Sequence, residues 1–345
     1  SADAAQLVVK SAFRYKLMNF TDDSESFTDL YAVSENFLQY HREIVFSTKY
    51  NNTVSVEQQN SPLTMGGKGL TNPTQNLADA FGMANGKGIN EPGSGYDEDH
   101  PYVGRDPRFY MTFAYDGSEF TVNDKTQTIE TFEGGKDATA TNKTATKTGY
   151  YLKKLLSPQA VWDGRTNNIT RTWILMRYAE VLLNAAEAAI ELSLAGVTSP
   201  DGENLLQLAT KAVNDIRERA GATLLTSNLT ATEGGRDIVR KERRKELAFE
   251  HKTKWDLRRW RVQDYNNRGG FWGETRDKDK FSSNSRYRFR GLYPFFSTQA
   301  GKYFFDARFQ WTSNRTADYS TIDYYFGIPG GEVTKSPLID QQPNR

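Results

Sequence analysis

The chain has no cysteine and only three histidines. Without cysteine it can form no disulfide, no thiolate nucleophile and no cysteine-ligated metal site. The histidines, His41, His100 and His251, are too far apart in the sequence to form the closely spaced ligand pairs of a zinc motif. The sequence therefore excludes cysteine-based chemistry and carries no zinc signature.

An excess of charge of one sign is also missing, because 44 Lys and Arg residues face 43 Asp and Glu residues. The net charge of +1 argues against a nucleic-acid partner, since nucleic-acid-binding domains usually carry a basic excess. No window approaches the run of about eighteen apolar residues that a membrane-spanning helix needs. The opening stretch SADAAQLVVKSAFRYKLM lacks the basic region and cleavage site of a signal peptide. We therefore expect that an export signal was removed or that the chain is part of a longer one.

Aromatic side chains, by contrast, are abundant and make up 13% of the 345 residues. Most of them are Tyr and Phe, and the mean hydropathy of the whole chain is only −0.70. Such residues either fill a core or coat a binding surface. The length predicts one large domain or two closely packed ones.

Short, mixed elements are predicted at the start of the chain. Apolar residues recur at helical spacing from about residue 4 to residue 17. The β-branched and aromatic residues of Arg42–Asn52 indicate a short strand. A short helix is expected at Gln75–Met83 because a turn signal follows it.

The segment that starts at Arg108, RFYMTFAYDG, alternates like a strand. It ends in Asp116-Gly117, a hairpin-turn signal, and EFTVND and TIETFEGG are candidate partner strands. The low-complexity segment Lys136–Gly149 is expected to be mobile or to run over the surface.

Three helices are predicted further along, at about Thr172–Ser193, in ENLLQLATKAVNDIRERAG with Gly221 as its C-cap, and from about Gly235 to Glu250. The first has alanine on more than one face, which lets helices approach closely and suits stacked helix hairpins. An alternative is that alanine is simply the best helix former. We expect a tetratricopeptide-like hairpin without a full consensus repeat.

The third helix continues into RKERRKELAFEHKTKWDLRRW, which is rich in both charges and tryptophan. One interpretation is a basic patch with aromatic residues for nucleic acid. The other is a charged helix held by ion pairs and by Arg–Trp stacking, because Glu242 and Glu246 lie four residues apart among the cations. We favour the second interpretation.

Together, several segments resemble the SusD/RagB family. ILMRYAEVLLNAAEAAIEL, AVNDIRERAG and IVRKERRKELAFEHKTKWDLRRW occur in the order and spacing of the family's C-terminal half. TQNLADAFGMANGKGI, GYDEDHPYVGRDPRFYMTFAYDG and GYYLKKLLSP resemble its middle segment, and GIPGGEVTKSPLIDQQP resembles its ending, with Ser336 in place of an Asn. The resemblance covers nearly the whole chain.

The resemblance implies a mainly α fold, with tetratricopeptide-like helix hairpins, a large irregular loop-rich part and a few short strands. One SusD-like domain would span residues 1–345 without its N-terminal part. Its expected segments are a helical and loop segment at 1–85, a loop-rich segment with short strands at 86–170, a helical hairpin core at 171–260 and an irregular aromatic-rich end at 261–345.

The resemblance also implies a function. Members of the family are surface lipoproteins of the Bacteroidetes outer membrane that bind glycans, and sometimes peptides, above a SusC-like TonB-dependent transporter. They are binding proteins rather than enzymes. The implied partners are therefore that transporter and a glycan, with no nucleic acid. The implied membrane contact is an N-terminal lipid anchor that this chain does not carry.

Aromatic rings beside hydrogen-bonding side chains are the groups that bind sugars, because rings stack on C–H faces and polar groups bind hydroxyls. Loop segments of this kind supply the candidate ligand residues. Core packing is the alternative role for each of them. Trp173, Trp255 and Trp260 are assigned to the core. The candidates are Trp162, Asp163 and Arg165, then Phe271 and Trp272, then Tyr96 and Tyr102.

Further hypotheses stand beside glycan capture. A glycosidase would need two carboxylates across a cleft, and acid pairs carry little information in a chain with 43 acids. The cluster YDEDH (Tyr96–His100) has oxygen ligands suited to a structural calcium ion, but a solvated loop is the favoured interpretation, and no cofactor is expected. A scaffold that binds only protein is the stronger rival, together with a peptide-binding role.

Overall fold

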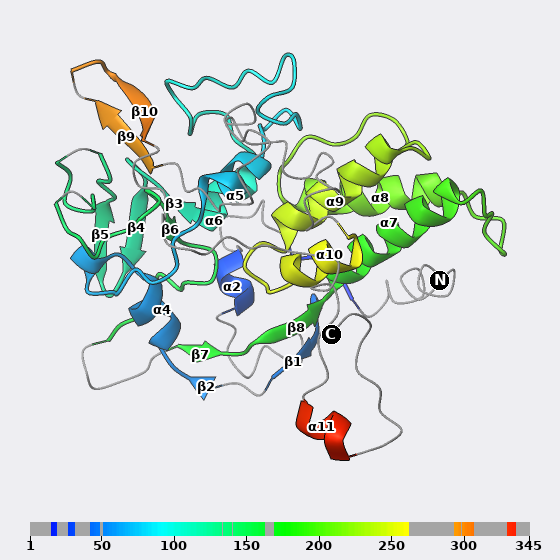
Figure 1. Ribbon diagram of the computed structural model, residues 1–345, viewed down its shortest axis with the longest axis horizontal. Helices are drawn as coiled ribbons and strands as arrows, with labels where there is room; N and C mark the ends of the chain where they lie inside the picture. The colour runs from blue at the N-terminus through cyan, green and yellow to red at the C-terminus, as the bar shows by residue number, and fades with distance from the viewer. Residues whose placement is uncertain are drawn as a thin grey trace.

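Figure 1 shows the computed structural model, in which the longer helices gather on the right and short strands with shorter helices lie on the left. The structure describes residues 15–18, 27–31, 42–48, 51–132, 134–139, 141–162, 169–261, 293–297, 299–306 and 330–335. Within these ranges no helix combines the length and apolar character needed to cross a membrane.

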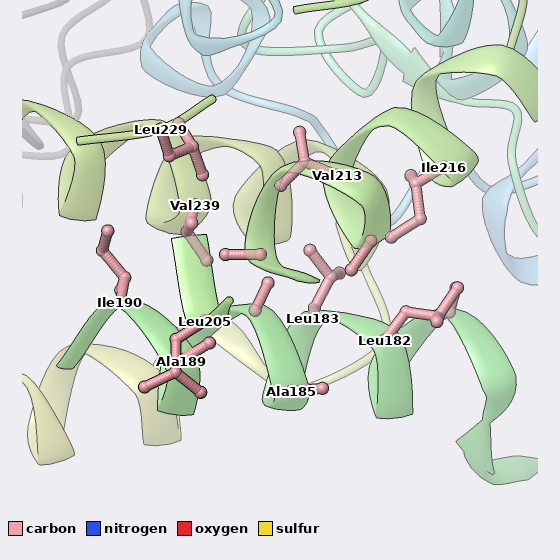
Figure 2. Close-up of a cluster of buried hydrophobic side chains, with 14 of the residues drawn as sticks. Leu182, Leu183, Ala185, Ala189, Ile190, Leu205, Val213, Ile216, Leu229 and Val239 are labelled. Atoms are coloured by element: carbon pink, nitrogen blue, oxygen red, sulfur yellow. The ribbon is translucent and has the colours of Figure 1, made fainter. Parts of the chain in front are cut away.

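The helical side consists of α7 (Tyr178–Leu194), α8 (Leu205–Arg219), α9 (Glu233–Glu246) and α10 (Thr253–Arg259). The facing sides of α7, α8 and α9 form one apolar core, shown in Figure 2. This arrangement confirms the expected mainly α fold with helix hairpins. The core residues that Figure 2 labels are Leu182, Leu183, Ala185, Ala189, Ile190, Leu205, Val213, Ile216, Leu229 and Val239.

Two of these helices begin at side-chain caps. The Asn204 side chain accepts a hydrogen bond from the backbone N–H of Gln207, and the Thr232 hydroxyl accepts one from the N–H of Gly235. Such caps replace hydrogen bonds that the first turn of a helix lacks. At the other end of α8, Gly221 has a φ of +69°, which confirms its expected role in ending the helix.

The alanines of α7 lie on the sides that face its neighbours. Ala179, Ala185, Ala186 and Ala189 are buried against neighbouring elements. Because their side chains are short, α7 can contact α8 and α9 at the same time. The predicted start of this helix at Thr172 is wrong, however, because the chain stays extended up to residue 177.

A two-stranded antiparallel ribbon explains that difference. Strand β8 (Ile174–Arg177) pairs with β1 (Ile44–Ser47), and β7 (Thr170–Arg171) pairs with β2 (Asn51–Asn52). The backbone N–H of Thr48 bonds to the carbonyl of Trp173 and joins the two pairs. Pairing with β1 and β2 therefore outweighs the helical pattern of this segment, and the predicted strand at Arg42–Asn52 is confirmed as β1 and β2.

The loop-rich side carries two more antiparallel pairs, β3 (Phe113–Ala114) with β6 (Tyr151–Leu152), and β4 (Glu119–Val122) with β5 (Lys125–Thr128). The predicted strand from Arg108 is wrong for its first half, which forms α6 (Pro107–Thr112). Asp106 caps that helix and Pro107 occupies its first turn, a combination that favours a helix start.

The hairpin turn also differs from the prediction. Asn123 and Asp124 connect β4 and β5, with φ of +55° and +56°. Both values fit the two-residue turn whose twist matches a hairpin. Asp116-Gly117 instead precedes β4.

The low-complexity segment Lys136–Gly149 is largely packed against the protein, and its exposed residues cluster at 141–144. Ala138, Ala145, Thr146 and Thr148 are buried, and the Thr146 hydroxyl donates to the carbonyl of Tyr150 at 2.6 Å. Small side chains allow this segment to fold closely against the body of the protein. The prediction of a surface excursion is therefore wrong for these buried residues, and mobility of the segment stays a prediction.

The remaining described elements are short. The predicted helix at 75–83 is confirmed over six residues, whereas residues 15–18 are not helical and residues 4–14 lie outside the described ranges. Most of the predicted C-terminal segment 261–345 also lies outside them. The short elements not yet named are α2 (Phe27–Tyr31), α4 (Ser55–Asn60), η1 (Leu63–Met65), α5 (Gln75–Ala80), β9 (Tyr293–Ser297), β10 (Lys302–Asp306) and α11 (Gly330–Lys335).

Candidate functional site

Buried ion pairs join the two sides of the molecule. The Arg177 guanidinium lies 2.7 Å from Glu43, 2.8 Å from Glu246 and 2.8 Å from Glu250. All four side chains are buried. Burial alone would raise the pKa of Glu250, but the charges of Arg177 and Lys154 outweigh it and lower that pKa to about 2. The carboxylate therefore stays ionised at neutral pH.

A second set of pairs surrounds Glu242. Its carboxylate lies 2.6 Å from Arg108 of α6 and 2.8 Å from Arg217 of α8, and 3.4 Å from Lys245 of its own helix. Burial alone would raise the pKa of Glu242. The three cations outweigh this effect and hold the pKa well below its usual value. The loop-rich side is thus held to the helices by charges that water does not reach.

These contacts decide between the two interpretations of the charged helix. Arg243 of α9 pairs with Asp256 at 2.7 Å, and Arg240 stacks over the Trp260 ring at 4.8 Å. Lys245 also reaches Asp106 at 3.3 Å. The interpretation as an ion-paired helix with Arg–Trp stacking is confirmed. The partners are mostly buried and lie on other elements, which the i, i+4 spacing did not indicate.

Next to this network, a loop between α5 and α6 closes on itself at its base. Met83 and Arg105 form a β-bridge, and the N–H of Ala84 bonds to the carbonyl of Gly104 at 2.8 Å. The Thr223 hydroxyl also donates to the carbonyl of Ala84 at 2.7 Å. We call residues 84–104 the clasped loop, and it forms part of the cyan segment at the top of Figure 1.

The β9–β10 hairpin docks onto the clasped loop. The backbone N–H of Tyr303 lies 3.3 Å from the carbonyl of Asp99, and Lys302 forms an ion pair with the Asp99 carboxylate at 3.5 Å. The Tyr303 hydroxyl donates to Asp116 at 2.8 Å, and its ring lies 5.0 Å from that of Tyr102. Burial and the Asp116 carboxylate both raise the pKa of Tyr303, so the hydroxyl keeps the proton that it donates.

This contact brings an aromatic ring together with exposed polar groups. Phe304 is 39% exposed, and the ammonium of Lys302 lies 5.4 Å from its ring centroid. On the loop, Asp97 accepts from the N–H of Asp99 at 2.9 Å and bonds to His100 at 2.7 Å, which lowers the pKa of Asp97. We call Asp97, Asp99, His100, Lys302 and Phe304 the loop–hairpin surface.

A family comparison identifies the chain. A model of the SusD family matches residues 37–344, which is most of the sequence. The chain belongs to the SusD family. The resemblance drawn from the sequence is therefore confirmed. A comparison with curated proteins found no significant match.

Solved SusD-like structures share the fold. A SusD-like protein from Bacteroides fragilis is 23% identical with a TM-score of 0.65, over 100% of this chain and 62% of that one. A SusD-like carbohydrate binding protein from the same organism is 23% identical with a TM-score of 0.57, over 76% and 48%. Surface glycan-binding protein A from Bacteroides uniformis is 17% identical with a TM-score of 0.51, over 99% and 55%. The chain spans less than two thirds of the length of these SusD-like structures.

Within this SusD-family chain, the candidate ligand residues fall in different places. Tyr96 is partly exposed and directly precedes Asp97 of the loop–hairpin surface. Tyr102 is only 8% exposed and packs among Phe109, Tyr115 and Tyr303. Tyr102 thus supports the surface from beneath. Asp163, Arg165, Phe271 and Trp272 lie outside the described residues and remain predictions.

Trp162 lies apart from the loop–hairpin surface. It is partly buried against the core beneath β4 and β5, and its backbone N–H donates to the side-chain oxygen of Asn123 at 2.9 Å. The indole lies over Gly66, whose φ of +88° and missing side chain permit this approach. Its role in ligand binding remains a prediction.

The three tryptophans assigned to the core behave differently. Trp173 and Trp260 are partly buried, and Trp260 donates from its indole to Glu187 at 2.7 Å. Trp173 precedes β8 and is not in a helix. The core assignment of Trp255 is wrong, because the residue is 55% exposed on α10. Its helix has only seven residues, and Asp256 and Leu257 take the buried side.

Two side chains of the loop–hairpin surface, Phe304 and Lys302, were not among the candidates predicted from the sequence. The run of three aromatic residues in KYFFD is a strand signal that could have indicated them. The acid cluster at Asp97–His100 was noticed, but the hairpin that approaches it lies about two hundred residues later in the chain. Among the described residues no group of three or more acidic or histidine side chains is arranged to hold a metal ion.

Proposed function

We propose that this SusD-family chain binds a glycan at the bacterial cell surface through the loop–hairpin surface. The observation that carries the proposal is the exposed ring of Phe304 beside Lys302 and the Asp99 carboxylate. An aromatic face bordered by polar groups suits a sugar, whose C–H face stacks on the ring while its hydroxyls reach the polar groups. The names of two structural neighbours, a carbohydrate binding protein and a surface glycan-binding protein, support the same ligand class.

The proposed role ends at binding and delivery. The chain holds the glycan and passes it to a partner TonB-dependent transporter in the outer membrane, where it faces the exterior. The family membership supports this role. The loop–hairpin surface offers hydrogen bonds and a stacking face, so no chemical step is proposed.

A protein-binding role is the second candidate, and a different surface favours it. Phe46 is 61% exposed on β1, and its strand partner Met176 is also exposed. Leu175 and Trp255 are exposed on β8 and α10, and Lys252, the residue before α10, donates to the carbonyl of Leu175 at 2.7 Å. We call these four exposed residues the strand–helix surface. Exposed apolar groups of this kind often mark protein contacts, which suits a transporter, a scaffold partner or a peptide.

Intrinsic tryptophan fluorescence tests the proposal against its rivals. The purified protein is titrated with neutral and acidic oligosaccharides from plant, bacterial and host sources, and with peptides. A saturable change with one glycan class, without turnover of that glycan, is expected. Because the loop–hairpin surface contains no tryptophan, every result of the fluorescence screen is checked by calorimetry. Binding of peptides alone would favour the peptide-binding role, and no heat of binding from a folded protein would favour the scaffold role. Loss of binding in Trp162→Ala or Trp272→Ala, measured by calorimetry, would place the site at those residues instead.

A further inference from the structure

Arg105 stands at the base of the clasped loop and makes three charge-assisted hydrogen bonds there. Its guanidinium donates to the carbonyls of Gly82 at 3.0 Å, Pro101 at 2.9 Å and Ala78 at 2.5 Å. The side chain is buried. A planar guanidinium is suited to such a fan of acceptors, which a lysine ammonium cannot reproduce from one position.

The contacts of Arg105 fall on both sides of the polar residues of the loop–hairpin surface. The guanidinium carbon lies 5.6 Å from the ring centroid of Tyr96, which directly precedes Asp97. The bonded carbonyl of Pro101 directly follows His100. The four residues between these contacts are therefore held at both ends by one side chain.

Several backbone hydrogen bonds within the loop are local. The N–H groups of Glu91, Ser94, His100 and Val103 bond to carbonyls three residues before each of them. Such turns set short stretches of backbone, but they do not tie the loop to the body of the protein. The β9–β10 hairpin contacts the loop at Asp99 through Tyr303 and Lys302. Arg105 links the same stretch to the other side, because its guanidinium also stacks on Phe109 of α6 at 4.5 Å.

We infer that Arg105 is a positioning residue of the loop–hairpin surface, holding Asp97–His100 in the conformation that meets the ligand. This inference rests on the proposed function. A binding loop that is already ordered before the ligand arrives loses less conformational entropy on binding, which raises affinity. Arg105 itself touches no ligand and acts through the loop.

The test compares Arg105→Lys with Arg171→Lys. Both changes keep the charge and alter a buried arginine, but Arg171 lies in β7, at the lower edge of Figure 1, and pairs with Glu57. Hydrogen exchange of the clasped loop is measured by mass spectrometry, and affinity for the glycan found in the fluorescence screen is measured by calorimetry. In Arg105→Lys we expect loop exchange about ten-fold faster and affinity about ten-fold weaker, as loss of charge-assisted hydrogen bonds implies. In Arg171→Lys both should stay within about two-fold of the parent.

Three results would overturn the inference, two of them in Arg105→Lys itself. One is unchanged loop exchange in Arg105→Lys, and the other is faster exchange with unchanged affinity. A loss of affinity of equal size in Arg171→Lys would also overturn it, because the effect would then reflect general destabilisation. If the parent protein binds no glycan, the proposed function fails. Hydrogen exchange of the clasped loop then decides by itself whether Arg105 holds the loop in its conformation.

Discussion

Arg177 and Glu250 form a buried two-point ion pair. The Nε of Arg177 lies 2.8 Å from one carboxylate oxygen of Glu250, and a terminal nitrogen lies 2.8 Å from the other. Arg177 ends β8 at the start of α7, and Glu250 follows α9. This one ion pair therefore joins the end of the strand ribbon to α7 and to the chain that follows α9. Neighbouring ion pairs connect the same region to the loop-rich side.

Removing the cation of this pair should be costly. Arg177→Met would leave Glu43, Glu246 and Glu250 buried without their shared partner. We expect a loss of about 3–5 kcal/mol in the free energy of unfolding, measured by urea denaturation. The control is Lys211→Met, which breaks the exposed Lys211–Asp215 pair and should cost about 1 kcal/mol or less. Equal losses in the two variants would contradict the account.

The pH dependence of stability follows from the same pair. The pKa of Glu250 is lowered to about 2 in the folded protein, below its usual value of 4.5. The unfolded chain therefore binds the proton more readily, and stability is lost as pH falls from about 4.5 towards 2. The contribution of this group is on the order of 3 kcal/mol above that range. Glu250→Gln should be less stable at pH 7 and should lose less stability on acidification, as urea denaturation at several pH values would show. An equally steep acid loss in that variant would count against the assignment.

Local signals predicted α8 and α9 well, the start of α7 and the whole of α6 less well, and the charged contacts poorly. The bounds of α8 and its terminal Gly221 follow from periodicity and from the preference of glycine for a positive φ. The partners of Glu246 do not, because Arg108 lies 138 positions earlier in the chain. Trp255 was misplaced for a related reason, since a helix of seven residues has too few turns for its pattern to show which side is buried. The contact between the β9–β10 hairpin and the clasped loop also joins segments that are far apart in the chain, so local signals did not predict it.

The backbone at Gly66 should not tolerate a side chain. Its φ of +88° is strained for any residue with a Cβ, and that Cβ would lie 3.4 Å from the Trp162 indole. Gly66→Ala should lower the free energy of unfolding by about 1–2 kcal/mol and shift the tryptophan emission. Gly234→Ala, where φ is not positive and the nearest atom lies 3.6 Å away, should be neutral or stabilising by up to about 1 kcal/mol. Similar losses at both glycines would contradict this explanation.

Tight packing of α7 predicts a difference between two neighbouring alanines. Ala186 is fully buried in the helical core, whereas Ala188 is only partly buried. Ala186→Leu should destabilise the protein by about 1–3 kcal/mol, because the extra methyl groups must displace α8 or α9. Ala188→Leu should change stability by about 0.5 kcal/mol or less. Thermal unfolding of both variants gives the comparison, and a tolerated leucine at 186 would show that the helices do not approach as closely as described.

The central claim is that the loop–hairpin surface binds the glycan, and its most direct test is calorimetry with one ring removed. Phe304→Ala and Phe46→Ala each delete one exposed phenylalanine, the first on the loop–hairpin surface and the second on the strand–helix surface. For the glycan found in the fluorescence screen, we expect Phe304→Ala to weaken binding about ten-fold and Phe46→Ala to leave it unchanged. Unchanged affinity in Phe304→Ala, with the fold intact by circular dichroism, would contradict the proposed site. A loss in Phe46→Ala alone would move the site to the strand–helix surface.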